Sequence, residues 1–147
     1  MLRHMTEQTR TLDTIVAFAR ANPLGVVATV APDGAPEAAL IDLITHANGT
    51  ITFLAHRSAR KLVNLASEGR VAIVVGTEGP VTVQIEGYAR VVEGEERALW
   101  AGRTADVQPA APVDREDFAL IVVAPVWLRY YDGATRPPLI DEMRVSV

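Results

Sequence analysis

Six short runs rich in β-branched residues, separated by tight-turn signals, constrain the fold of this chain more than any other feature. Pro32-Asp33-Gly34 and Asn48-Gly49 are both turn sequences, and the second is a strong signal for a hairpin between antiparallel strands. The run 71–75 is apolar throughout, which predicts a strand covered on both faces. The predicted strands cover residues 24–31, 37–46, 50–55, 70–76, 81–92 and 118–131.

Three further segments predict helices, which cover residues 11–21, 59–68 and 95–103. In the first, the apolar residues that recur with the helical period are Leu12, Ile15, Val16 and Ala19. In the second, the residues expected on the buried side are Leu62, Leu65 and Ala66. Six strands with short turns and only peripheral helices predict a mainly β fold, a six-stranded antiparallel split barrel. Strands that are apolar on both faces need cover from outside the barrel, so we expect a homodimer.

Length and composition limit the domain count and the partners. The chain has 147 residues and no cysteine, which suits a single domain without disulfides. We expect this domain at 11–136, with tails at 1–10 and 137–147, residues 1–4 resembling a cloning remnant. A net charge of −4 and few aromatics argue against a nucleic-acid partner. Neither a signal peptide nor a run of about 20 apolar residues is visible, so the sequence predicts a cytoplasmic protein without membrane contact.

The segment 53–65, with the sequence FLAHRSARKLVNL, holds the strongest candidate site. The other two predicted helices begin with acidic residues and end with Arg, as the helix dipole favours, but the middle helix has Arg60 and Lys61 in its first turn. Free N–H groups at a helix start bind anions, so a phosphate there would relieve the unfavourable charge arrangement. The candidate ligands of that phosphate are His56, Arg57, Ser58, Arg60 and Lys61.

The same cluster also has an explanation without a ligand. Charged clusters are commonly solvated surface, and Arg57 and Arg60 would then pair with Glu68 or Asp42. The local pattern by itself leaves both explanations open.

Other chemistry has less support in the sequence. Ser58 suits a helix cap better than a nucleophile, and no Ser-His-Asp arrangement stands out. His46 and His56 lack the Cys or spaced His neighbours of metal sites, so we predict no metal. The sequence assigns no catalytic residue.

The order of these elements and the Arg60-Lys61 pair at a strand–helix junction resemble the pyridoxamine 5′-phosphate oxidase-like, FMN-binding split-barrel superfamily, over about residues 24–133. The resemblance implies that Arg60 and Lys61 hold the FMN phosphate and that the backbone of Phe53 and Leu54 lies along the flavin. It also implies a homodimer with the cofactor at the subunit interface. The residues implied to contact the flavin ring through their backbone are Leu40, Ile41, Asp42 and Leu43.

The chain departs from the oxidase itself at several positions. Ala39 stands where the oxidase has a phosphate-binding Arg, and Ile44 stands where it has a substrate-binding Lys. The resemblance implies that Tyr131 or Trp127 of the other subunit covers the ring, although packing is the simpler role for Trp127. We therefore expect this chain to share the barrel and the phosphate-binding residues of the family, but not the oxidation of vitamin B6.

These observations predict an FMN-dependent oxidoreductase that acts on a small molecule. Two alternatives stay open, a deazaflavin-dependent reductase of the same fold and a non-catalytic carrier or sensor that binds flavin or haem. The segment 101–117, rich in Ala, Pro and small polar residues, predicts a loop that shapes the substrate entrance.

Overall fold

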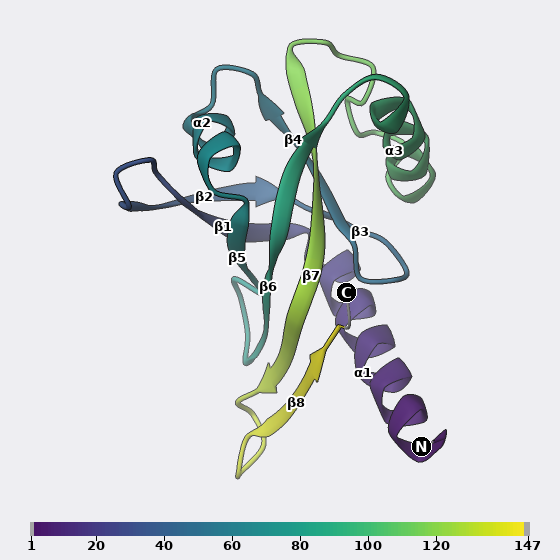
Figure 1. The fold of residues 1–147 in the computed structure, drawn as a ribbon. Helices are drawn as coiled ribbons and strands as arrows, with labels where there is room; N and C mark the ends of the chain where they lie inside the picture. Colours follow the sequence, from purple (N-terminus) through teal and green to yellow (C-terminus); the bar gives the residue numbers. More distant parts are fainter. Residues whose placement is uncertain (1, 146–147) are drawn as a thin grey trace.

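A computed structural model describes residues 2–145, with side chains from residue 7 onward. These residues form a mainly β fold, as predicted, in which three helices surround one curled antiparallel sheet (Figure 1). The described strands are β1 (Leu24–Val30), β2 (Pro36–Asp42), β3 (Ile44–Thr45), β4 (Ile51–His56), β5 (Arg70–Val75), β6 (Val81–Val92), β7 (Phe118–Asp132) and β8 (Leu139–Arg144). The helices are α1 (Leu2–Ala21), α2 (Arg60–Ser67) and α3 (Gly94–Val107).

Two glycines close the predicted turns. Gly34 and Gly49 each have a φ of 90°, a conformation that residues with a Cβ rarely adopt. The N–H of Gly34 donates to the carbonyl of Ala31 at 2.8 Å, and the N–H of His46 donates to that of Thr50 at 2.8 Å. Both predicted turns are confirmed.

The segment predicted as one strand at 37–46 forms two strands, which lie at opposite edges of the sheet. The order across the sheet is β2-β1-β5-β6-β7-β4-β3, and Leu43 alone separates β2 from β3. The N–H of Leu43 leaves the ladder and donates to the carbonyl of Pro23 at 2.7 Å. Because one residue joins the two edges, the sheet has to curl until they approach each other. The result is a half-barrel in which the described parts of β2 and β4 share no ladder.

The inner face of the curled sheet holds the main hydrophobic core. Val27, Ile73 and Ile85 point into it from β1, β5 and β6 and are at most 2% exposed. α1 packs on this core through Ile15 and Ala19, which confirms the predicted apolar stripe. Trp100 of α3 packs against a smaller core on the other side of the sheet, which consists of Val92, Leu120 and Val122.

Both ends of the chain carry more regular structure than the sequence indicated. α1 begins at Leu2, so residues 2–10 continue the helix where we expected a tail, because no Gly or Pro interrupts them; Met1 lies outside the described residues. β8 lies within the tail expected at 137–147. β7 is 15 residues long and β4 only 6, so the second half of β7 has a free edge that β8 fills. The sheet thus has more strands than the six predicted.

Two helices also differ in detail. α3 continues to Val107 and ends before Pro109, which shortens the loop predicted at 101–117 to 108–117. In α2, Leu65 is buried as predicted, but Ala66 is exposed and Asn64 is buried in its place. No helix of the described chain is long and apolar enough to cross a bilayer.

Candidate functional site

The start of α2 faces a cavity of about 210 Å³ beside the open edge of β2. Arg60 and Lys61 line it together with Thr29 of β1 and with Glu37 and Ala39 of β2. The structure therefore brings the two predicted phosphate ligands to one hollow.

The first turn of α2 has no side-chain cap for its backbone donors, of which the N–H of Leu62 bonds to the carbonyl of Ala59 at 3.1 Å. The N-cap is Ala59, which offers no side-chain hydrogen bond, and the first turn contains no acidic residue. The prediction that Ser58 caps this helix is wrong. Ser58 comes one residue before the N-cap, and its hydroxyl bonds to the His56 ring at 2.8 Å. An uncapped helix start with two cations is a suitable place for an anion.

A carboxylate that the sequence analysis missed lies in the same cavity. Glu37 forms an ion pair with Arg60 through one oxygen and accepts a hydrogen bond from Asn64 Nδ2 through the other, at 2.7 Å. Asn64 is buried and also donates to Thr29 Oγ1, at 2.9 Å. The period of the strand could have indicated Glu37 from the sequence. Glu37, Ala39 and Ile41 lie at every second position of β2 and therefore share one face.

Lys61, the single lysine of the chain, is the free cation of the cavity. Its side chain is half-buried and makes no hydrogen bond or ion pair with any residue that the structure describes. Arg60, Lys61 and Glu37 together leave the cavity with a single net positive charge.

The other predicted ligands on this segment turn toward the loop 108–117. Arg57 donates to the backbone carbonyl of Glu116 at 2.6 Å and pairs with Glu93 at 3.3 Å. His56 Nε2 lies 3.9 Å from Asp117, whose pKa the neighbouring Arg115 guanidinium holds below its usual range. The alternative partners weighed for the cations are also wrong, because Glu68 pairs with Arg70 and Asp42 forms no ion pair among the described residues.

A second, larger cavity continues along the same strand edge. It measures about 480 Å³ and is lined by Ile41, Asp42 and Leu43 on one side and by Leu54 and Phe118 on the other. The loop 108–117 covers it with Gln108 and with residues 110–112. Four of the residues expected to contact the flavin ring therefore line one cavity: Ile41, Asp42 and Leu43 from the segment 40–43, and Leu54 of β4.

The side chains of the remaining predicted residues do not line either cavity in this chain. Phe53 is fully buried in the main core, and Leu40 is 56% exposed on the outer face of the sheet. Tyr131 and Trp127 lie on the half of β7 that pairs with β8, far along the strand from Phe118, which pairs with His56. Neither aromatic lines either cavity in its own chain.

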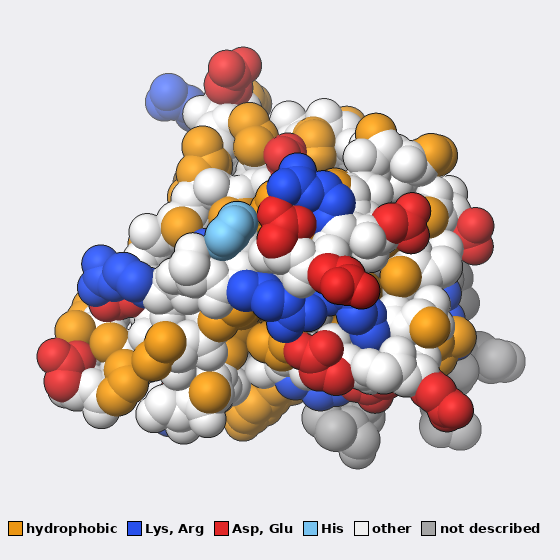
Figure 2. All heavy atoms as spheres, turned by 90° about the horizontal axis from the view of Figure 1, so that it is seen from above, with side chains coloured by type: hydrophobic (Ala, Val, Ile, Leu, Met, Phe, Trp, Pro, Cys, Tyr) orange, Lys and Arg blue, Asp and Glu red, His pale blue; other side chains and the backbone are white. Residues whose placement is uncertain are grey.

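Metal chemistry has no site among the described residues, since no three His, Cys, Asp or Glu side chains come together. His46 is buried, and its Nε2 bonds to Thr52 Oγ1 at 2.9 Å. Viewed from the end where α2 and α3 lie, Lys and Arg side chains are interspersed with Asp and Glu (Figure 2). The positive charge at α2 is therefore local.

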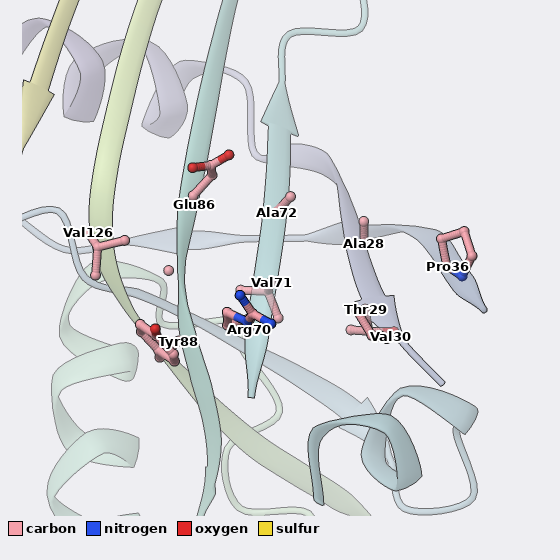
Figure 3. Close-up of a pocket in the computed structure, with 11 residues that line it drawn as sticks. Ala28, Thr29, Val30, Pro36, Arg70, Val71, Ala72, Glu86, Tyr88 and Val126 are labelled. Atoms are coloured by element: carbon pink, nitrogen blue, oxygen red, sulfur yellow. The ribbon is translucent and has the colours of Figure 1, made fainter. Parts of the chain in front are cut away.

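The outer face of β2, β1 and β5 is apolar and uncovered. Leu40, Val26 and Val74 lie side by side in register across these strands and are between 36% and 56% exposed. The strand predicted as covered on both faces, β5, is thus covered on one face only within this chain. Figure 3 shows a cavity of about 390 Å³ on the same side of the sheet, with Arg70 and Tyr88 close together in it.

A family model described as pyridoxamine 5′-phosphate oxidase matches residues 11–132. No curated protein matches the sequence significantly.

Solved structures share the split-barrel fold. A haem-binding protein from Mycobacterium smegmatis is similar with a TM-score of 0.74 and 22% identity, over 90% of this chain and 57% of that one. An FMN-binding protein related to pyridoxamine 5′-phosphate oxidase, from Nostoc punctiforme, is similar with a TM-score of 0.62 and 13% identity, over 99% and 96% of the two chains. An F420 reductase is similar with a TM-score of 0.57 and 22% identity, over 73% and 90%. This chain thus spans little more than half of the haem-binding protein.

Proposed function

The chain belongs to the pyridoxamine 5′-phosphate oxidase-like family of FMN-binding split barrels, and we propose that it binds FMN along the open edge of β2 and acts as an oxidoreductase on a small molecule. One observation carries the proposal: a cationic, uncapped helix start and a larger, mostly apolar cavity lie along the same exposed strand edge.

The phosphate belongs at the start of α2. Lys61 supplies an unpaired ammonium group there, and the first N–H groups of the helix have no cap. Arg60 adds a planar guanidinium, 80% exposed, whose geometry suits two oxygens of a phosphate. In this proposal Arg57 is not a phosphate ligand, because it does not line the cavity and pairs with Glu93 elsewhere.

The ring system belongs in the second cavity. Ala39 at the first cavity and Ile41 at the second are two residues apart on β2, about 7 Å at the rise of a strand. This spacing suits a ligand with a phosphate at one end and a ring at the other. Unpaired backbone groups on the edge of β2 offer hydrogen bonds to the polar edge of the ring, while Leu54 and Phe118 offer apolar contact.

A homodimer would complete this site. Apolar strand faces that one chain leaves uncovered favour a second copy as their cover, and the uncovered face is formed by β1, β2 and β5. Tyr131 is too far along β7 to reach the ring cavity of its own chain, so any role as a ring cover falls to the partner.

The flavin would supply the redox chemistry, and the protein would orient it and the substrate. Ile44, at the position of the oxidase's substrate-binding Lys, is buried and lines the ring cavity. An apolar residue there favours a substrate without a phosphate group over pyridoxamine phosphate.

Two related ligands are the second candidates. Likeness in fold to an F420 reductase favours a deazaflavin, and likeness to a haem-binding protein favours a haem carrier or sensor. Haem needs an axial ligand, and of the described histidines His46 is committed to Thr52 while His56 is exposed. The absorbance spectrum of the purified protein, alone and after titration with FMN, F420 or haemin, separates the three.

The test of the phosphate site is Lys61→Ala. We expect FMN affinity to fall by about 1.5–3 kcal/mol, the scale of a charge-assisted hydrogen bond, with Arg60→Ala acting in the same direction. Affinity for riboflavin, which has no phosphate, should not change. Flavin fluorescence titration measures both, and Arg57→Ala is the matched control. Unchanged FMN affinity in the Arg60→Ala/Lys61→Ala double variant would contradict the proposal.

A further inference from the structure

Glu37 places a negative charge inside the cavity that faces the start of α2. Its side chain is 20% exposed, against 80% for Arg60, so the carboxylate is the deeper member of the pair. Both of its oxygens are engaged, one by Arg60 and one by Asn64. Without a ligand, the Glu37 carboxylate therefore supplies the negative charge that two cations at a helix start favour.

The anchoring of Glu37 makes this arrangement specific. Asn64 is 3% exposed, and its amide bonds to Thr29 as well as to Glu37, so the carboxylate is tied to both β1 and α2. Such a carboxylate does not simply swing into solvent when another anion arrives. Arg60, by contrast, is exposed and free to change partners.

Two opposite effects on phosphate binding follow from this geometry. Glu37 orients Arg60, which would favour the ligand, and it repels a phosphate in the same cavity, which would oppose it. Exposed ion pairs orient their partners weakly, whereas like charges held close together in a partly buried site are strongly unfavourable. The repulsion is therefore the larger effect.

We infer that Glu37 is an internal competitor of the cofactor's phosphate, a specificity-determining residue that weakens the binding of phosphorylated ligands by occupying Arg60. The inference rests on the proposed phosphate site. It also assigns unequal roles to the two cations: Lys61 is available at once, and Arg60 must first leave Glu37.

The experiment compares the wild type with Glu37→Gln, which keeps an acceptor for Asn64 and removes the charge. We expect Glu37→Gln to bind FMN about tenfold more tightly, because the competing charge is gone, and to bind riboflavin unchanged. Glu93→Gln is the matched control, since Glu93 also pairs with an Arg of this segment but lies outside the cavity; it should bind FMN as the wild type does. Glu37→Ala provides a second variant with the same expected direction.

The outcomes separate the inference from the proposed function. If the wild type binds FMN and both Glu37 variants bind it equally or more weakly, Glu37 is no competitor, and the flavin proposal stands. If riboflavin affinity rises as much as FMN affinity, the effect does not act through the phosphate, and the inference is again wrong. If neither the wild type nor the variants bind FMN, the proposed function fails and the inference falls with it.

Discussion

At the scale of single residues, a buried polar chain joins α3 to the sheet. His46 Nε2 bonds to Thr52 Oγ1, which bonds to Thr104 Oγ1 of α3 at 2.8 Å. The His46 ring also packs edge-on against Trp100. Burial lowers the pKa of His46, and the positive charges of two nearby arginines, Arg20 and Arg103, lower it further. The folded protein therefore keeps His46 neutral where an unfolded chain would protonate it.

This shift predicts a pH dependence of stability. Because the folded-state pKa of His46 lies below 6.5, the unfolded state binds more protons as pH falls below 6.5, and stability should decline there. One such group contributes a slope of at most about 1.4 kcal/mol per pH unit. His46→Gln, which can still bond to Thr52, should show a flatter dependence between pH 7.5 and 5 in urea unfolding. Equal slopes in the wild type and His46→Gln would contradict the assignment.

At the scale of elements, the longest antiparallel strand pair, β6 and β7, contains a β-bulge. Its register shifts between Glu86, which pairs with Trp127, and Gly87, which pairs with Pro125, so Val126 is the extra residue on β7. A Cβ at Gly87 would lie 2.4 Å from the carbonyl oxygen of Ala124, so only glycine lets the two backbones approach this closely. Glycine inside a strand is typical of a bulge or a close backbone approach, and the structure has both at this pair.

Gly87→Ala should therefore destabilise the protein by at least about 1–3 kcal/mol, because the contact is with backbone that cannot move aside. The matched substitution is Gly102→Ala in α3, where a Cβ meets nothing within 4 Å. Alanine should stabilise that helix by about 0.5–1 kcal/mol. Urea unfolding of the two variants measures both effects, and a neutral Gly87→Ala would show that the β6–β7 pair can shift its register.

At the scale of the whole molecule, the sheet has one face on the core and one apolar face in solvent. Val26, Leu40 and Val74 are neighbours across three strands of that face. The apolar residues at positions 71–75 of β5 supply the core on one side and require cover on the other. The chain provides that cover for β4 and β7, through α3, but not for β1, β2 and β5.

We expect Val74→Arg to convert the proposed dimer into a monomer, because it places a charge at the centre of this face. FMN affinity should fall with it, since the partner would no longer cover the ring. Leu99→Arg is the control, as Leu99 is 51% exposed on α3. Sedimentation equilibrium reads the assembly state, and a Val74→Arg protein that remains a dimer would place the interface elsewhere.

The sequence alone determined the parts of this protein that depend on local chemistry. Hairpin turns, the apolar stripe of α1, the strand runs and the cationic start of α2 follow from residue type and spacing, so they were predicted. The sequence did not predict the strand break at Leu43, the pairing of β8 or the partners of Arg57 and Arg60.

Those features depend on contacts between segments far apart in the chain. Leu43 breaks the strand because the sheet curls until its two edges approach each other, and β8 forms because β7 is longer than β4. Arg60 and Glu37 are 23 residues apart and meet only because β2 turns its inner face toward α2. Charge pairing is a property of the folded surface, which is why the sequence located the cations at α2 but only the tertiary structure showed that a carboxylate pairs with Arg60.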